Sequence, residues 1–229
     1  IAELLVDVAA CRRSVAAQPD LERGAIGELH DAVRAREQGC VEALLRLYGF
    51  RPQDAAAADL PLLDGRWGDD LFNPETLKEL GVKIGGGMAA GAAAGAGVDL
   101  MVGGITMGAA ALLGALAGGG AQTARHYGNR LLSKFKGQRE LTVDDAVLRL
   151  LALRQRQLLI ALAARGHAAM EAIRLDAPDD KTWREGKLPE ALHRCRAHPQ
   201  WSSLNPGARL QDSERQVAIE GLLANLRKD

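Results

Sequence analysis

The sequence predicts an all-α fold, a helical bundle arranged around a helical hairpin that is rich in glycine and alanine. Aromatic residues make up only 3% of the chain, and strands usually require aromatic and β-branched residues. Apolar residues recur at helical spacing along most of the chain. Residues 84–124 contain a single charge, Asp99, among glycines and alanines. No strand is predicted.

The N-terminal region, residues 1–50, predicts two amphipathic helices. The apolar pattern that begins at the first residue predicts a helix that ends before Pro19. A second pattern predicts a longer helix from Ile26 to about Gly49. Residues 51–73 lose the periodicity and contain prolines, glycines and aspartates, so they are predicted to form an irregular linker.

The third region, residues 74–175, is predicted to begin with the hairpin. Asn73 is a good N-cap for a helix that runs into the glycine-rich stretch. Glycines at four-residue spacing line one helix face with small residues, so that two backbones can approach closely. The predicted packing glycines are Gly87, Gly91, Gly95, Gly104, Gly108, Gly114 and Gly118. Asp99 interrupts this pattern and is predicted to lie at the turn between the two arms.

A long amphipathic helix is predicted to follow the hairpin. The segment 142–145 ends in two aspartates, which suit a helix N-terminus, and the helix is expected to reach about Ile173. Residues 176–229 are predicted to form short helices and loops. The helices are expected near 190–196 and 213–226.

Three arginines of the long helix, Arg149, Arg154 and Arg156, are candidates for a face that binds a partner. The simpler interpretation is a solvated stripe with pairs within the helix, such as Asp145 with Arg149. Arg154 lies on the apolar side, so it either extends to solvent or pairs with a buried acid. Asp99 is one candidate for that acid.

No motif predicts a catalytic residue, a cofactor site or a metal site. The triple glycines 85–87 and 118–120 lack the following Lys-Ser/Thr and the preceding strand that a phosphate-binding loop requires. His193, Cys195 and His198 are possible ligands, but no further ligand lies nearby. Basic and acidic residues number 29 each, so charge gives no case for nucleic acid. Three scattered cysteines favour a reducing compartment.

Two stretches are more distinctive. Residues 97–114 read GVDLMVGGITMGAAALLG, and residues 139–155 read RELTVDDAVLRLLALRQ. Both resemble the uncharacterised C-terminal region of a group of bacterial Era-like GTPases. In those proteins a P-loop GTP-binding domain comes first, and a helical region with a Gly/Ala-rich hairpin follows. The resemblance implies GTP and Mg²⁺ for a preceding domain, and no GTP-binding residue is carried over to this sequence.

Two functions are expected from these features. The first is a non-catalytic effector or regulatory domain of a bacterial GTPase, in the cytoplasm or at the inner face of the membrane. Its partners would be its own GTPase domain and another protein or the membrane, and Ile1 lies within an amphipathic pattern, so we expect sequence upstream of it. The alternative is a free-standing hairpin that inserts into membranes, because residues 100–124 carry no charge and can span about 30 Å of hydrocarbon. Small residues favour close packing in protein and lipid alike, so both hypotheses stay open.

Overall fold

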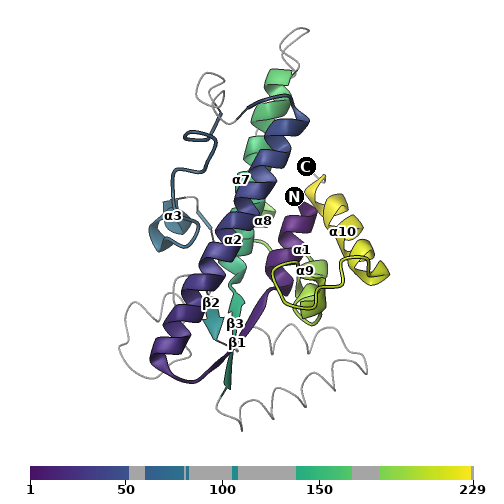
Figure 1. The fold of residues 1–229 in the computed structure, drawn as a ribbon. Helices are drawn as coiled ribbons and strands as arrows, with labels where there is room; N and C mark the ends of the chain where they lie inside the picture. The colour runs from purple at the N-terminus through teal and green to yellow at the C-terminus, as the bar shows by residue number, and fades with distance from the viewer. Residues whose placement is uncertain (52–59, 80, 83–104, 108–137, 167–180, 228–229) are drawn as a thin grey trace.

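The computed structural model describes residues 1–51, 60–79, 81–82, 105–107, 138–166 and 181–227, and these residues form a mixed α+β fold (Figure 1). The main elements in chain order are α1 (Ala2–Ala10), β1 (Arg12–Ala16), α2 (Pro19–Leu47), α3 (Pro74–Glu79), β2 (Ile105–Met107), β3 (Gln138–Val143), α7 (Asp145–Gly166), α8 (Lys181–Arg184), α9 (Glu190–Cys195), a 3₁₀ turn (Pro199–Trp201) and α10 (Ser213–Leu226). The long helices α2 and α7 leave the sheet in the same direction and lie side by side. Helices α1, α9 and α10 pack together beside them.

The prediction of an all-α fold is wrong, because three segments form an antiparallel sheet in the order β1-β3-β2. In its register Arg12 lies opposite Thr142, and Ile105 lies opposite Val143. Leu141, Thr142 and Val143 are at most 1% exposed, so the end of β3 is packed inside the fold. Burial of these residues against partners distant in sequence outweighs the helical composition of the chain.

Two expected helices are shortened by this sheet. The first helix ends at Ala10 rather than just before Pro19, and the next residues form β1. The side chain of Asn205 accepts a hydrogen bond from the Arg12 N–H at 3.0 Å, which helps to hold the chain in its extended path. In the predicted second arm of the hairpin, Ile105–Met107 forms β2 rather than helix.

Several helix ends agree with the sequence. α2 ends at Leu47, and Gly49 follows with a φ of +76°, a backbone conformation that favours glycine. The Asn73 side chain accepts a hydrogen bond from the Glu75 N–H at 3.0 Å at the start of α3, and Asp144 does the same for Ala146 at 2.7 Å at the start of α7. α3 ends at Glu79 instead of continuing into the glycine-rich stretch.

The two short C-terminal helices, α9 and α10, lie where they were predicted. The packing glycines, Asp99 and the end of the long helix beyond Gly166 lie outside the described residues. None of the helices in the described parts of the chain is long and apolar enough to cross a membrane.

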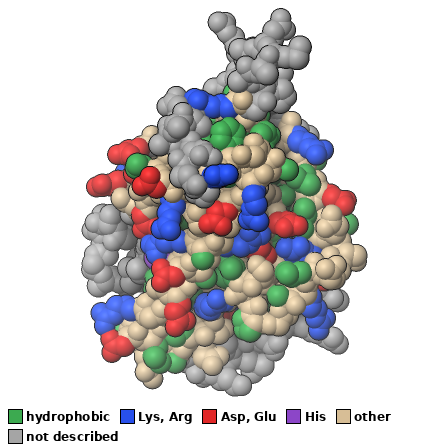
Figure 2. Space-filling view, turned by 45° about the horizontal axis from the view of Figure 1, so that its top comes forward, with side chains coloured by type: hydrophobic (Ala, Val, Ile, Leu, Met, Phe, Trp, Pro, Cys, Tyr) green, Lys and Arg blue, Asp and Glu red, His purple; other side chains and the backbone are tan. Residues whose placement is uncertain are grey.

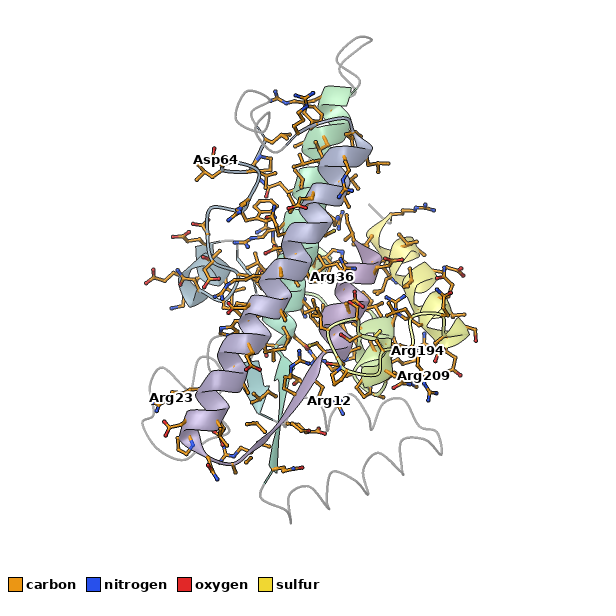
Figure 3. All side chains as sticks on the ribbon, in the orientation of Figure 1. Arg12, Arg23, Arg36, Asp64, Arg194 and Arg209 are labelled. Atoms are coloured by element: carbon orange, nitrogen blue, oxygen red, sulfur yellow. The ribbon has the colours of Figure 1, made fainter. Side chains whose placement is uncertain are left out.

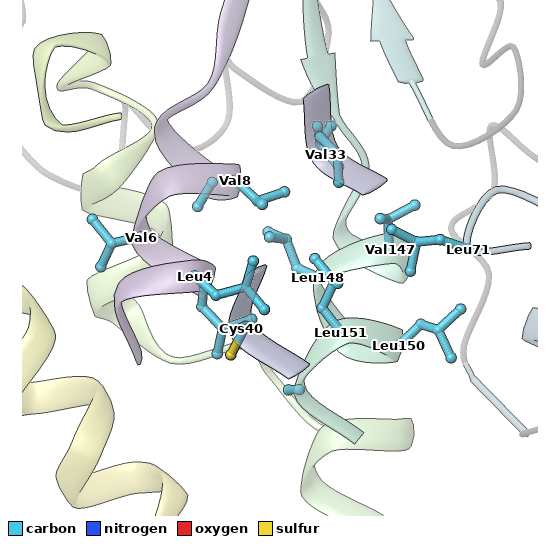
Figure 4. Close-up of a cluster of buried hydrophobic side chains, with 14 of the residues drawn as sticks. Leu4, Val6, Val8, Val33, Cys40, Leu71, Val147, Leu148, Leu150 and Leu151 are labelled. Carbon is cyan, nitrogen blue, oxygen red and sulfur yellow. The ribbon is translucent and has the colours of Figure 1, made fainter. Parts of the chain in front are cut away.

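The apolar core lies where α1, α2 and α7 meet. Figure 4 shows Leu4 of α1, Val33 of α2 and Leu148 of α7 converging there. Every residue of α7 from 146 to 153 is buried, so this half of the helix is surrounded by protein on all sides. Each fully buried leucine contributes about 1.5–3 kcal/mol relative to an exposed one.

A buried carboxylate connects the helical layers. Asp7 on α1 is 1% exposed, and its side chain accepts hydrogen bonds from Arg36 Nε of α2 at 2.7 Å and from the Ser203 N–H at 3.0 Å. Arg215 Nη2 of α10 lies 3.3 Å from the same carboxylate. In Figure 3, Arg36 lies between α2 and α1. The carboxylate therefore joins α1 and α2 to α10.

We expect Asp7→Ala to lower the free energy of unfolding by about 3–5 kcal/mol, because it leaves the buried guanidinium of Arg215 without its carboxylate. Urea unfolding measures this loss. Asp20→Ala is the control, since Asp20 pairs with Arg23 in an exposed contact, and its removal is expected to cost no more than about 1 kcal/mol. Equal losses for the two variants would contradict the role given to Asp7.

Candidate functional site

A pocket of about 550 Å³ lies between α2 and the segment that precedes α3. One wall is formed by Arg34, Glu37 and Gln38 of α2, and the other by residues 66–71. We call residues 60–72 the crossing segment. The volume of the pocket falls in the range of pockets that hold small molecules.

The crossing segment folds around a tight turn. Asp64 and Gly65 have φ values of +49° and +75°, and the backbones of Leu63 and Arg66 form two hydrogen bonds with each other, of 2.7 and 2.9 Å. An Asp-Gly pair with two positive φ values is the sequence that a two-residue hairpin turn favours. Asp64 lies at the outer edge of the molecule in Figure 3.

Further along, Gly68 faces the turn. A Cβ atom at Gly68 would lie 3.1 Å from Leu63 Cδ1, so the absence of a side chain lets the segment pass close to the turn. Both ends of the crossing segment are anchored by buried apolar side chains, which are Leu60, Leu62, Leu71 and Phe72.

Arg154 of α7 contacts the crossing segment through both a hydrogen bond and the Trp67 ring. Its side chain is buried, and its guanidinium Nη2 donates a hydrogen bond to the backbone carbonyl of Asp69 at 2.8 Å. Nη1 lies 3.5 Å from Glu37 Oε1 of α2, in an ion pair that is also buried. The guanidinium carbon lies 5.3 Å from the centre of the Trp67 ring, within cation–π distance. One side chain thus joins α7 to both walls of the pocket.

Two further contacts hold the segment against α2. Arg34 donates two hydrogen bonds of 3.0 Å to the two carboxylate oxygens of Asp70, and a third of 2.9 Å to Asp31. These hydrogen bonds from Arg34 lower the pKa of Asp70. Gln38 Nε2 donates to the backbone carbonyl of Gly65 at 3.2 Å. The pocket is therefore preformed by polar contacts from both long helices.

Glu37 is the most unusual titratable group of the pocket. It is 6% exposed, and this burial raises the pKa of its carboxyl group, although Arg154 opposes the shift. Near it, the indole Nε1 of Trp67 is buried, and within the described parts of the chain it has no hydrogen-bond partner.

The three arginines singled out in the sequence lie inside the fold. Arg149, Arg154 and Arg156 are 7%, 3% and 5% exposed, so the interpretation of a solvated stripe is wrong. The guanidinium of Arg149 donates to the backbone carbonyls of Trp183 at 3.1 Å and Gly186 at 2.7 Å. The alternative that Arg154 pairs with a buried acid is confirmed, and the acid is Glu37.

Sequence reasoning missed Glu37 and Trp67. Glu37 lies midway between Val33 and Val41 on the buried side of α2, at four-residue spacing, and a charge in an apolar stripe marks a residue that needs a partner. The turn of the crossing segment was also missed, and the Asp64-Gly65 pair is the sequence signal that could have predicted it.

Two of the possible metal ligands near the C-terminus, Cys195 and His198, are packed against protein groups. Cys195 is fully buried, and burial raises its pKa to about 12. The His198 ring stacks on Trp201 with 4.1 Å between the ring centres. Within the described ranges, no group of three or more His, Cys, Asp or Glu side chains is placed to hold a metal ion.

Comparison with protein families extends over nearly the whole chain. The family model of DUF3482, a domain of unknown function, matches residues 1–224. The chain belongs to this family. Searches of curated proteins and of solved structures each gave no match. The match runs from α1 into α10, so the pocket lies within the DUF3482 domain.

Glu37 gives the DUF3482 domain a testable pH dependence. The folded domain holds the Glu37 proton more tightly than the unfolded chain does, because burial raises the pKa. The contribution of Glu37 to stability therefore falls as the pH rises from about 4.3 through the raised pKa. Glu37→Gln removes this contribution, so we expect wild type to lose stability relative to Glu37→Gln across that window.

Urea unfolding of both proteins between pH 4 and pH 8 measures this difference. Glu42→Gln, an exposed glutamate of the same helix, controls for the loss of one carboxylate. A difference between wild type and Glu37→Gln that stays constant with pH would show that the proton on Glu37 is held no more tightly in the folded state.

Proposed function

We propose that this DUF3482 domain is a non-catalytic regulatory module of a bacterial GTPase, which contacts its own GTPase domain and a further protein or the membrane. The observation that supports it most is the resemblance of residues 139–155 to the C-terminal region of Era-like GTPases. These residues form β3 and the first half of α7. β3 is the central strand of the sheet, and α7 contacts α1, α2, α3 and α8.

The position of these residues makes the resemblance informative. They are packed among most other elements of the domain, so a sequence resemblance there concerns the framework rather than a surface loop. A shared framework supports a shared domain type, and a shared domain type supports the same position after a GTP-binding domain.

The pocket suits binding better than reaction. Arg34 and Asp70 form a bidentate pair, and Arg154 and Glu37 form a buried pair. Charged groups that neutralise each other within the protein are held in place, which gives a pocket of fixed shape. This arrangement supports a role in recognising a ligand or partner and transmitting its presence through α2 and α7.

The direct test uses the complete protein that contains this domain. We expect the sequence upstream of Ile1 to contain a Gly-x-x-x-x-Gly-Lys-Ser/Thr loop, and removal of residues 1–229 to change the rate of GTP hydrolysis. Replacement of the loop lysine by alanine is the control, and it should abolish hydrolysis with the domain present or absent. A complete protein without a GTP-binding domain, or an unchanged hydrolysis rate, would refute the proposal.

Flotation with anionic vesicles separates the two kinds of contact. Flotation of the complete protein with vesicles would assign the contact to the membrane. The uncharged stretch 100–124 would then be the candidate for the segment that contacts the lipid. Retention in the vesicle-free fraction would assign the contact to a protein partner.

A further inference from the structure

The charges around the pocket balance. Its walls contain Arg34 and Arg66 together with Glu37, Asp69 and Asp70, and Arg154 lies beneath them. Basic and acidic side chains are also interspersed across the face in Figure 2, rather than gathered by sign. A nucleotide would face the three carboxylates, and a polyamine or a divalent cation would face the three guanidinium groups. A ligand without net charge meets the least repulsion.

Two of these charged side chains have no ion-pair partner among the residues that the structure describes. Arg34 is paired with Asp70, and Arg154 is paired with Glu37. Arg66 and Asp69 form no ion pair and no side-chain hydrogen bond with any other residue in the part of the chain that the structure describes. The two residues are exposed, of opposite charge, and three positions apart in the crossing segment.

The spacing of Arg66 and Asp69 suits a small ligand. Three residues of even fully extended chain span no more than about 11 Å, so the long side chain of Arg66 and the short side chain of Asp69 can reach the same small molecule. Trp67 lies between them in the sequence, lines the pocket and is partly exposed. Its ring offers an apolar surface beside the two charges.

We propose that this pocket binds a free α-amino acid with an apolar side chain. The guanidinium of Arg66 pairs with the α-carboxylate, the carboxylate of Asp69 pairs with the α-ammonium group, and the apolar side chain lies against Trp67. The hydrogen bonds from Arg154, Arg34 and Gln38 to the crossing segment hold this wall in place before the ligand arrives. No covalent step is involved.

Calorimetric titration of the chain 1–229 with the twenty amino acids at millimolar concentration is the first measurement. We expect binding by members with apolar side chains, with leucine as the reference ligand. Two analogues each lack one charge of leucine: 3-methylbutylamine lacks the carboxylate, and 4-methylpentanoate lacks the ammonium group. Each analogue should bind at least about fivefold more weakly than leucine.

Two variants then assign the charges. Arg66→Gln should weaken leucine binding about fivefold and bind leucine no better than 3-methylbutylamine, because the carboxylate has lost its partner. Asp69→Asn should likewise bind leucine no better than 4-methylpentanoate. Arg209→Gln and Asp20→Asn change exposed charges outside the pocket and should leave binding unchanged.

Three results would overturn the proposal. They are the absence of heat from every amino acid, an affinity for either analogue equal to that for leucine, and leucine binding that is unchanged in both pocket variants. The titration needs no GTP-binding domain, so these results are independent of the GTPase proposal.

Discussion

A guanidinium group removed from water must find acceptors for its N–H donors, and this requirement determines much of the structure. Among the described residues five arginines are buried: Arg149, Arg154, Arg156, Arg196 and Arg215. Several of them donate to backbone carbonyls in other parts of the fold, such as Arg196 to Val143 at the end of β3, at 2.9 Å, and Arg215 to Trp201 at the end of the 3₁₀ turn, at 2.9 Å. These hydrogen bonds connect the arginines to segments of the chain that lie far from them in sequence or belong to other elements.

The composition explains why arginines take this role. With only 3% aromatic residues, the chain has few aromatic side chains to fill the spaces between its helices and loops. An arginine side chain is long enough to cross such a space, and its methylene groups pack against apolar neighbours while its head finds polar ones. At the pocket, Arg154 reaches from α7 to Glu37 and to the carbonyl of Asp69 in this way.

The parts of the fold that depend on local sequence could be predicted. The caps at Asn73 and Asp144 are properties of neighbouring residues, and the structure has these helix starts where the sequence places them. The sheet could not be predicted in this way. β1 pairs with β3, which lies more than a hundred residues further along the chain, and no local pattern records that pairing.

The candidate site was also predicted only where it depends on local sequence. The sequence singles out Arg154, because a charge on an apolar helix face needs a partner. Its partners Glu37 and Trp67 come from distant parts of the sequence, so only the tertiary structure identifies them. Glu37 is likewise a charge on the apolar face of a helix, α2. Two charges of opposite sign on the apolar faces of two long helices are candidates for an ion pair, and sequence analysis can propose such a pair before a structure is known.

A double-mutant cycle on Arg154 and Glu37 tests the central claim most directly. Arg154→Met and Glu37→Leu each leave one buried charge without its counter-charge, so each should lower the free energy of unfolding by about 3–5 kcal/mol. In the double variant neither charge remains, and urea unfolding should give a loss at least about 2 kcal/mol smaller than the sum of the single losses. Losses that add to within about 0.5 kcal/mol would show that the two residues act independently, and would contradict the account.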